Sequence, residues 1–321
     1  MRESDILNGQ VSVKGESASR RRGLMKNLKK DYLLYLMLLP AIVIVAIYSY
    51  YPMFGVIIAF EKFSAYKGFF RSPWVGFDNF RFLFNSPDFS PALRNTLVIS
   101  VLKIIGNQIV PITAALLLNE LRSVLIKRGI QTLIYLPHFL SWVILAGILK
   151  DVLSPSSGIV NQAIMALGFE PIPFLLSNTW FPFTIVVSDI WKEFGFNTIV
   201  YLAALTTINP SLYEAAVMDG ASRWKQTFHI TLPGMLPIIV LMATLSLGNV
   251  LNAGFDQIFN LYSPVTYQSG DVLDTLIYRV GIENAQYSLS TAIGLFKSAV
   301  SMVLISVSYW LAYRFANYRI F

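Results

Sequence analysis

The stretch YEAAVMDGASRWKQTF, from Tyr213 to Phe228, is polar and rich in alanine, whereas the chain on either side of it is mostly apolar. Asparagine and proline precede it at positions 209 and 210. This pair favours the start of a helix, because asparagine caps helices and proline suits the first helical position. Ser211 and Glu214 also have the spacing of a capping box. The sequence therefore predicts a helix over 210–219, in a connection between two apolar segments.

A glycine divides this connection into two parts. Gly220 can adopt the left-handed backbone conformation that ends a helix. Ser222 can begin a second short helix that runs toward His229, before Pro233 and Pro237 return the chain to the next apolar run. We expect a helix, a glycine turn and a second helix, with small alanine side chains that permit close approach of another surface.

The composition of the chain is that of a membrane protein. Of 321 residues, 55% are hydrophobic and only 13% are charged, and the charged share is about half that of a soluble domain. Apolar runs long enough to cross a membrane as helices lie near residues 32–60, 96–118, 130–149, 180–205, 237–259 and 291–313. The predicted fold is an all-α polytopic membrane protein with six transmembrane helices.

The basic residues predict the orientation of these helices. Of 25 Lys and Arg residues, 15 lie on the side of the N-terminus, eight of them before Asp31, and seven lie on the opposite side. Because basic residues concentrate on the cytoplasmic side, both termini and the 206–235 loop are expected in the cytoplasm. Residues 1–31 form a basic cytoplasmic tail that can contact acidic membrane lipid, and residues 32–321 form the transmembrane domain. The membrane explains the net charge of +7 better than nucleic acid does.

The loop carries a family signature. The EAA signature of permease subunits in binding-protein-dependent ABC importers is matched at Glu214, Ala215, Ala216, Asp219, Gly220, Ala221, Phe228, Leu232, Pro233 and Pro237. The chain resembles this family over most of its length, including WVGFDNFRFLF after the first apolar run and YLAALTTINPSLYEAA leading into the loop. Both segments are similar to the carbohydrate-uptake branch, in particular to oligosaccharide and polysaccharide permeases of the alginate-importer group.

The resemblance implies a type I ABC importer permease fold in a multi-pass protein of the bacterial plasma (inner) membrane. It implies a heterodimer with a second homologous permease subunit, which works with two ATPase subunits and an extracytoplasmic solute-binding protein that delivers a saccharide. In that family the EAA loop is a coupling helix inserted into the ATPase. By motif match, the coupling residues of this chain are Glu214, Ala215, Ala216, Asp219, Gly220 and Ala221.

ATP hydrolysis is not expected from this chain. It contains no G-x-x-x-x-G-K-[ST] phosphate loop, and its cytoplasmic segments are too short for a nucleotide-binding domain. It has no cysteine and only two histidines, far apart in sequence, so we expect hydrogen-bonded histidines and no metal site. No cofactor is predicted on this chain, and ATP and Mg²⁺ are expected on the partner ATPase.

Two predicted spans carry polar faces that flank the loop. Asp189, Lys192, Glu193 and Asn197 have the spacing i, i+3, i+4, i+8, and Asn249, Asn252 and Asp256 have the spacing i, i+3, i+7. Charged groups within a membrane face a bundle interior or a wet cavity, and carboxylates and amides suit sugar hydroxyls. These seven residues predict the substrate path. The open alternative is that they pair with one another, Lys192 with Asp189 for example, to hold the helices together.

Two other classes of membrane protein are less consistent with this sequence. A proton-coupled carrier would use Asp189, Glu193 and Asp256 as a relay, but no inverted repeat is evident and the loop would be unexplained. An intramembrane enzyme would need a nucleophile with a base, or a metal cluster, and the sequence suggests neither. The sequence leaves open which saccharide is carried and whether it is acidic.

Overall fold

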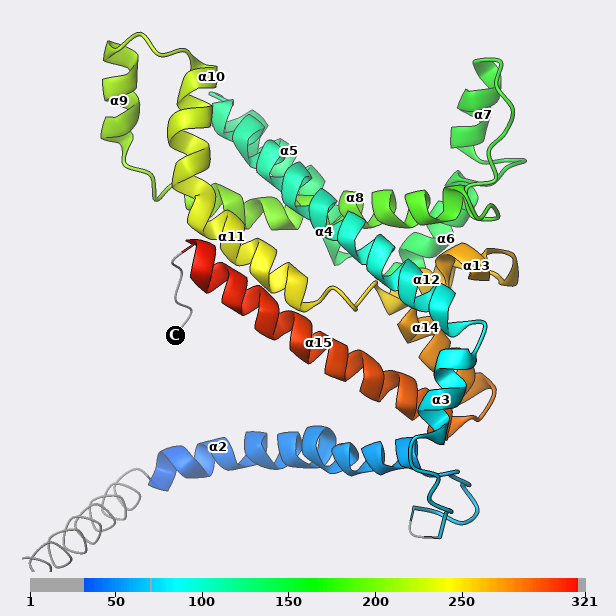
Figure 1. Cartoon of the computed structure of the whole chain (residues 1–321). Coiled ribbons are helices and arrows are strands. Elements are labelled where there is room, and N and C mark those ends of the chain that lie inside the picture. Colours follow the sequence, from blue (N-terminus) through cyan, green and yellow to red (C-terminus); the bar gives the residue numbers. More distant parts are fainter. Residues whose placement is uncertain (1–31, 70, 317–321) are drawn as a thin grey trace, which may run out of the picture. The chain divides into compact units, whose positions relative to one another are not determined.

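The computed structural model describes residues 32–69 and 71–316, and these are helical almost throughout (Figure 1). Within them there is no strand, and the only β-bridge joins Glu61 to Trp74. The chain divides into two compact units between Ile57 and Ile58. The basic tail expected at 1–31 lies outside the described residues.

The first predicted span, residues 32–60, is one helical segment of 29 residues. It consists of α2 (Tyr32–Val45), a π-helical turn η1 (Ala46–Tyr50) and a 3-10 segment η2 (Tyr51–Phe60). The elements that follow are α3 (Asp78–Asn85), α4 (Phe89–Glu120), α5 (Val124–Tyr135), η3 (Leu136–Phe139), α6 (Trp142–Val152), α7 (Ile159–Ala166), α8 (Trp180–Leu205), α9 (Pro210–Met218), α10 (Arg223–Gln226), η4 (Thr227–Thr231), α11 (Leu232–Gly248), α12 (Phe255–Leu261), η5 (Pro264–Thr266), α13 (Tyr267–Gly270), α14 (Leu273–Tyr278), η6 (Arg279–Glu283) and α15 (Tyr287–Ala316).

Four helical segments are long and apolar enough to cross a membrane, namely Tyr32–Phe60, Phe89–Glu120, Arg223–Gly248 and Tyr287–Trp310. The bent pair formed by α5–η3 and α6 makes a fifth if it counts as one span. Helix α8 has 26 residues and the bounds predicted for the fourth span, but three charged residues interrupt its apolar character. The described residues therefore provide four or five apolar spans, and the remaining expected span, the fourth in sequence, corresponds to the charged helix α8.

The third predicted span, 130–149, is not a straight helix. It bends by 103° between η3 and α6. Pro137 lies in η3, and Ser141 caps the start of α6 by accepting a hydrogen bond from the backbone N–H of Ile144 at 3.4 Å. Proline removes a backbone donor and serine supplies a cap, so one helix ends here and another begins.

The prediction of one helical span over 237–259 is wrong. Helix α11 ends at Gly248, and the helix that follows, α12, starts only at Phe255. Gly254 has a φ of +97°, a conformation that L-residues rarely adopt. The chain turns at this glycine, so the two parts of the apolar run do not share one helix axis.

Helix α4 connects the two ends of the second unit. Near its end at Glu120 it packs with α8 and α11 around Tyr201 and Met235, both fully buried. Near its start at Phe89 it packs with α3, α14 and α15 around Leu83 and Leu273. Because a helix rises about 1.5 Å per residue, these 32 residues separate the two ends by about 48 Å. Figure 1 shows α10 near one end of α4 and α3 near the other.

Candidate functional site

The loop between α8 and α11 forms the predicted helical hairpin. Asn209 caps α9, and its side-chain oxygen accepts a hydrogen bond from the backbone N–H of Ser211 at 3.0 Å. Asn209 is thus the capping residue, rather than Ser211 with Glu214. Helix α9 ends at Met218, and Gly220 follows with a φ of +73°. The prediction of a helix that stops at a left-handed glycine is confirmed.

The turn at Gly220 is a Schellman motif. The backbone N–H of Gly220 donates to the carbonyl of Val217 at 3.0 Å, and that of Ala221 donates to the carbonyl of Ala216 at 2.8 Å. These two bonds satisfy carbonyls that the end of a helix would otherwise leave without partners. The backbone groups of Ala216, Val217, Gly220 and Ala221 therefore close the turn.

The second helix of the hairpin starts at Arg223 as predicted but does not stop near His229. It continues through the π-helical turn η4 into α11, and the helical segment Arg223–Gly248 has 26 residues. Pro233 lies inside this continuous segment, directly after η4, and a π-helical turn next to a proline is a common irregularity of a continuous helix. The expectation that Pro233 and Pro237 separate the hairpin from the next span is therefore wrong.

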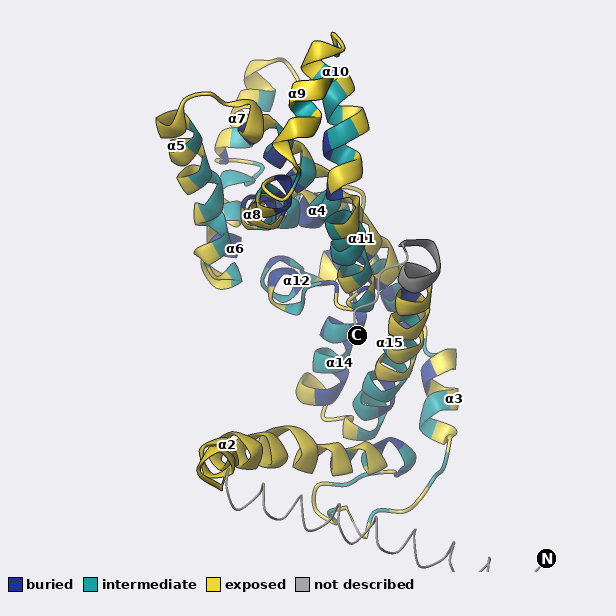
Figure 2. Ribbon diagram, turned by 90° about the vertical axis from the view of Figure 1, so that its left-hand side faces the viewer, coloured by how far each residue is buried: buried dark blue, intermediate teal, exposed yellow. Residues whose placement is uncertain are grey.

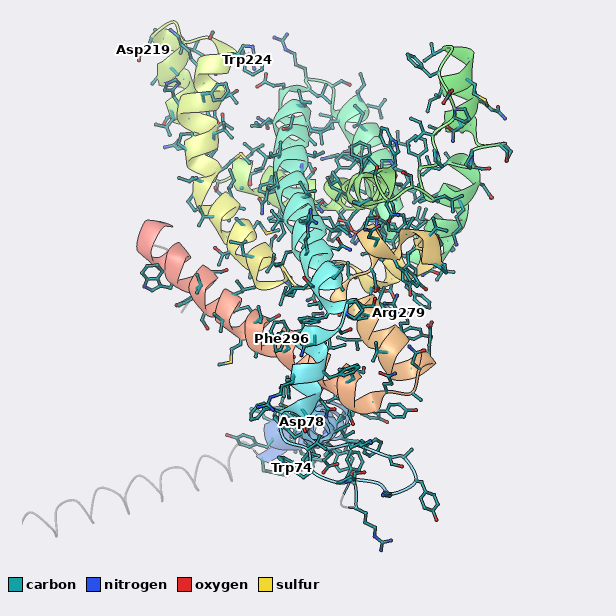
Figure 3. The ribbon with its side chains drawn as sticks, turned by 45° about the vertical axis from the view of Figure 1, so that its right-hand side comes forward. Trp74, Asp78, Asp219, Trp224, Arg279 and Phe296 are labelled. Atoms are coloured by element: carbon teal, nitrogen blue, oxygen red, sulfur yellow. The ribbon has the colours of Figure 1, made fainter. Side chains whose placement is uncertain are left out.

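Among the described residues, no part of the chain covers the outer surface of the hairpin. All six predicted coupling residues are exposed or half-buried, and Figure 2 shows α9 almost entirely exposed. Two apolar side chains that the sequence analysis did not single out are also exposed, Met218 at 86% and Trp224 at 74%. Figure 3 places Asp219 and Trp224 together at the tip of the hairpin. The sequence could have predicted both residues as site residues, because each is a large apolar residue within a polar loop.

Two contacts fix the hairpin to the helices beneath it. The Tyr213 hydroxyl lies 3.0 Å from the Thr231 hydroxyl, which ties α9 to η4. The Arg223 guanidinium donates to the Glu120 carboxylate at 2.8 Å, which ties α10 to the end of α4. The hairpin thus has one contact with η4 and one, between exposed side chains, with the end of α4.

The polar face of α8 is the second predicted site. Asp189 lies 3.0 Å from the Lys103 ammonium group and accepts a hydrogen bond at 3.0 Å from the side chain of Asn107. The Asn107 side chain in turn accepts from Asn197 at 3.5 Å. These contacts join α8 to α4, and the side chains of Lys103 and Asp189 are only 8% and 16% exposed.

Lys103 also reaches the chain that follows α11. Its ammonium group donates to the backbone carbonyl of Ala253 at 2.7 Å and to the side-chain carbonyl of Gln257. Gln257 is fully buried and donates to the hydroxyl of Ser188 at 2.9 Å. Gln257 was not predicted as a site residue, since an isolated glutamine in an apolar run gives no periodic signal.

The next two residues of the same face hold the bend between η3 and α6. Lys192 donates to the Glu193 carboxylate at 2.9 Å and to the backbone carbonyl of His138 at 2.8 Å. The other oxygen of Glu193 lies 2.7 Å from Nδ1 of His138, whose ring stacks on Phe196 at 4.0 Å. The ammonium group of Lys192 also lies 5.6 Å from the centre of the Trp142 ring. Lys192 thus pairs with Glu193 rather than with Asp189.

The polar residues after α11 have a different environment. Asn249 and Asn252 are exposed and lie outside any helix, and Asp256 is exposed in the first turn of α12. The prediction that these three share one helix face is wrong, because the helix ends at Gly248. The side-chain oxygen of Asn252 accepts from Lys297 at 2.7 Å. Among the described residues, the Asp256 carboxylate has no hydrogen-bond or ion-pair partner.

Taken together, these elements define a class of protein. The chain is all-helical, has several helices long enough to span a membrane, and presents an exposed helical hairpin at one end of its longest helices. In the part of the chain that the structure describes, no three His, Cys, Asp or Glu residues converge on a metal position. Such a chain is a polytopic helical membrane protein.

Comparison with known proteins identifies the family. Residues 108–317 match the family described as "Binding-protein-dependent transport system inner membrane component", and the chain belongs to it. It is 44% identical to Protein LplB of Bacillus subtilis (strain 168), over 92% of this chain and 93% of LplB. It is 41% identical to the polygalacturonan/rhamnogalacturonan transport system permease protein YteP of the same strain, over 94% of each chain.

Solved structures show the fold. The chain is similar to a bacterial ABC transporter involved in import of the acidic polysaccharide alginate, with a TM-score of 0.85 and 42% identity over 91% of this chain and 99% of that one. It is also similar to the alginate transporter in complex with an alginate pentasaccharide-bound periplasmic protein, with a TM-score of 0.83 and 42% identity over 90% and 96% of the two chains. The chain therefore has the type I ABC permease fold.

Proposed function

We propose that this chain is one of two transmembrane subunits of an ATP-driven importer that carries an oligosaccharide or polysaccharide across a bacterial plasma membrane. A second, homologous permease completes the path, two ATPase subunits hydrolyse ATP with Mg²⁺, and an extracytoplasmic solute-binding protein delivers the saccharide. The chain itself binds no cofactor. The names of the relatives support the substrate class, since they include permeases for polygalacturonan and alginate.

The observation that carries the proposal is the free surface of the α9–α10 hairpin. Its predicted coupling residues are Glu214, Ala215, Ala216, Asp219, Gly220 and Ala221, and we add Met218 and Trp224 as apolar anchors. Large exposed apolar side chains on a rigid turn are typical of protein interfaces. The bonds to Glu120 and Thr231 would then pass a movement of the ATPase to α4 and α11.

We further propose six membrane-spanning helices with both termini in the cytoplasm, and α8 is the one that the apolar criterion does not count. The domain 32–321 would follow a basic tail at 1–31, with the coupling loop at 206–235. A helix that carries charged side chains can span a membrane when those charges are paired within the protein, and the charged side chains of α8 are paired. The hairpin and α3 lie near opposite ends of α4, which supports placing them on opposite sides of the membrane.

For the substrate path we propose the segment that contains Asn249, Asn252 and Asp256. Broken helices supply ligand groups in many transporters, because the freed backbone and side-chain polar atoms face a cavity. Asp189, Lys192, Glu193 and Asn197 were predicted for the same role. Their partners within the chain support a role in holding α8 against α4 and η3 instead.

Reconstitution tests the proposed function. The complex of this chain with its companion permease and ATPase, supplied with the solute-binding protein, is expected to take up saccharide into proteoliposomes only when ATP is present. This chain alone is expected neither to hydrolyse ATP nor to transport. Uptake by the chain alone that depends on the proton gradient and is independent of ATP would indicate a secondary carrier and refute the proposal.

A further inference from the structure

A pocket of about 500 Å³ lies at the start of α4, at the end remote from the hairpin. It is formed by residues from three places in the sequence, and its lining consists of Pro87, Asp88, Pro91, Tyr267, Gln268, Asp271 and Arg279. Figure 3 shows Arg279 far from Asp219 and Trp224 at the tip of the hairpin. Pockets that bind small ligands usually measure about 300–1,000 Å³, so this one can hold a sugar residue.

The guanidinium group of Arg279 is fixed in the wall of the pocket. Its Nη2 atom donates to Asp271 at 2.6 Å, and the group lies 4.4 Å from the centre of the Tyr267 ring. Asp271 also accepts from the Thr275 hydroxyl at 2.6 Å and is buried, with a side chain only 5% exposed. By contrast, Nη1 of Arg279 is buried without a hydrogen-bond partner among the described residues. This nitrogen is closed to solvent as well, so a ligand in the pocket cannot reach it, and Arg279 instead holds the two carboxylates in place.

The polar groups that a ligand can reach in this pocket belong to Asp88 and Gln268. The Asp88 carboxylate is 62% exposed, and within the described residues its side-chain partner is Arg279, at the long distance of 3.5 Å. A carboxylate can accept several hydrogen bonds, so Asp88 retains acceptor capacity toward the pocket. The exposed amide of Gln268 adds one donor group and one acceptor.

The charges of the pocket select against acidic ligands. Burial acts to lower the pKa of Arg279, but the carboxylates of Asp271 and Asp88 outweigh it and raise that pKa, so the guanidinium remains charged. Burial raises the pKa of the Asp271 carboxyl, while the Thr275 hydrogen bond and the Arg279 charge act in the opposite direction. Two carboxyl groups thus share one guanidinium, and a third carboxylate brought by a ligand would be repelled.

This combination of groups fits a neutral sugar. Of two adjacent hydroxyls on a sugar ring, one can donate to Asp88 while the other accepts from the exposed side-chain amide of Gln268. Pro87, Pro91 and the Tyr267 ring offer apolar surface to the C–H face of the ring. We propose that this pocket is a subsite that holds one uncharged sugar residue of the transported saccharide at the outer end of the chain. The proposal rests on the proposed import function. It states in addition that the sugar residue bound in this pocket is uncharged.

Binding to the purified complex of both permeases and the ATPases, without solute-binding protein, tests the subsite. The probes are neutral oligosaccharides of galactose, glucose and mannose, and galacturonic acid oligosaccharides of the same length, and saturation-transfer NMR with calorimetry reports binding. At least one neutral probe is expected to bind more tightly than the acidic one. Asp88→Asn should weaken that binding about ten-fold or more, because it removes a hydrogen bond to a charged acceptor.

Two controls make the result decisive. Asp78→Asn is the matched control, since Asp78 is 69% exposed on α3, pairs only loosely with Arg81 at 3.8 Å and does not line the pocket. It should leave binding unchanged, and both variants should give normal complex yield. Gln268→Ala, at an exposed position, should weaken binding several-fold through loss of a neutral hydrogen bond.

Four outcomes would overturn the proposal: no binding of any neutral probe, tighter binding of the acidic probe, unchanged binding in Asp88→Asn, or an Asp88→Asn defect confined to association with the solute-binding protein. The last outcome would make the pocket a protein docking site. Uptake measured on the same preparations separates this test from that of the import function. If the wild-type complex imports saccharide but the pocket binds none, only the subsite is wrong.

Discussion

Two polar regions of this chain, the face of α8 and the segment after α11, look alike in sequence and differ in structure. Both place carboxylates and amides in an apolar run. On α8, Asp189 and Glu193 find cationic partners within the chain, in surroundings that are mostly buried. After α11 the helix is broken, and Asn249, Asn252 and Asp256 are exposed. An intramembrane charge that is already paired is expected to hold helices together, whereas an exposed carboxylate without a partner among the described residues, as at Asp256, is available to a ligand.

The largest effect expected from this comparison is that of Lys103→Met. The substitution leaves Asp189 buried without its cation, and breaking a buried ion pair destabilises by about 3–5 kcal/mol. The complex should therefore be recovered in low yield and unfold at a lower temperature. Thermal unfolding of the purified complex measures this.

The double variant Lys103→Met with Asp189→Asn is the control for charge. It removes both members of the pair, so it should recover part of the lost stability. If Lys103→Met instead assembled and unfolded like the wild type while transport failed, the α8 network would belong to the substrate path and the contrast between the two regions would be lost.

The next effect concerns the contact of α8 with α5. A Cβ atom added at Gly195 would lie 1.9 Å from the backbone carbonyl oxygen of Ile134. Backbone cannot move aside as a flexible side chain does, so Gly195→Ala should destabilise the complex by about 1–3 kcal/mol or more. Gly147→Ala on α6 is the matched control, because a Cβ there meets no atom within 4 Å. Alanine favours a helix over glycine, so the control should be neutral or slightly stabilising. Equal unfolding temperatures for the two variants would contradict the close packing of α8 on α5.

The hairpin provides a third test, in which stability and function should separate. Gly220→Val places a β-branched residue at a φ of +73°, which costs about 1–2 kcal/mol locally. The Schellman turn should distort, and ATPase association and saccharide uptake should be lost while the membrane helices still assemble. Gly68→Val is the control, since Gly68 has a similar φ of +70° on the other side of the predicted membrane. Copurification of the ATPase and uptake in proteoliposomes distinguish them. Normal uptake in Gly220→Val would refute the coupling assignment.

The sequence predicts some of these elements closely and others poorly, for physical reasons. The bounds of α8 and the stop at Gly220 follow from local signals, namely an apolar run and a left-handed glycine. The breaks after η3 and after α11 were missed because a hydropathy average over a run does not register a single turn. The signals were present in Pro137, Ser141 and Gly254. Likewise, periodicity places Asp189 on a helix face, but only the packed structure shows that Lys103 lies opposite.

The smallest expected effect is also the most direct comparison of the two regions, because the same chemical change is made in both. Asp256→Asn and Asp189→Asn each replace a carboxylate by an amide of nearly the same shape. Asp256 is exposed and has no ion-pair partner among the described residues, so its replacement should leave complex yield and unfolding temperature unchanged.

If Asp256 accepts hydrogen bonds from the passing saccharide, Asp256→Asn should lower uptake per assembled complex about several-fold to ten-fold, through loss of a charged acceptor. Asp189→Asn should give the opposite pattern, because it takes the anionic partner from Lys103, at 3.0 Å. Its yield and unfolding temperature should fall, while uptake per surviving complex stays near that of the wild type. Measuring both quantities on both variants decides the matter: a loss of stability in Asp256→Asn with unchanged specific uptake would mean that the break after α11 is also structural, and that the path lies elsewhere in the permease pair.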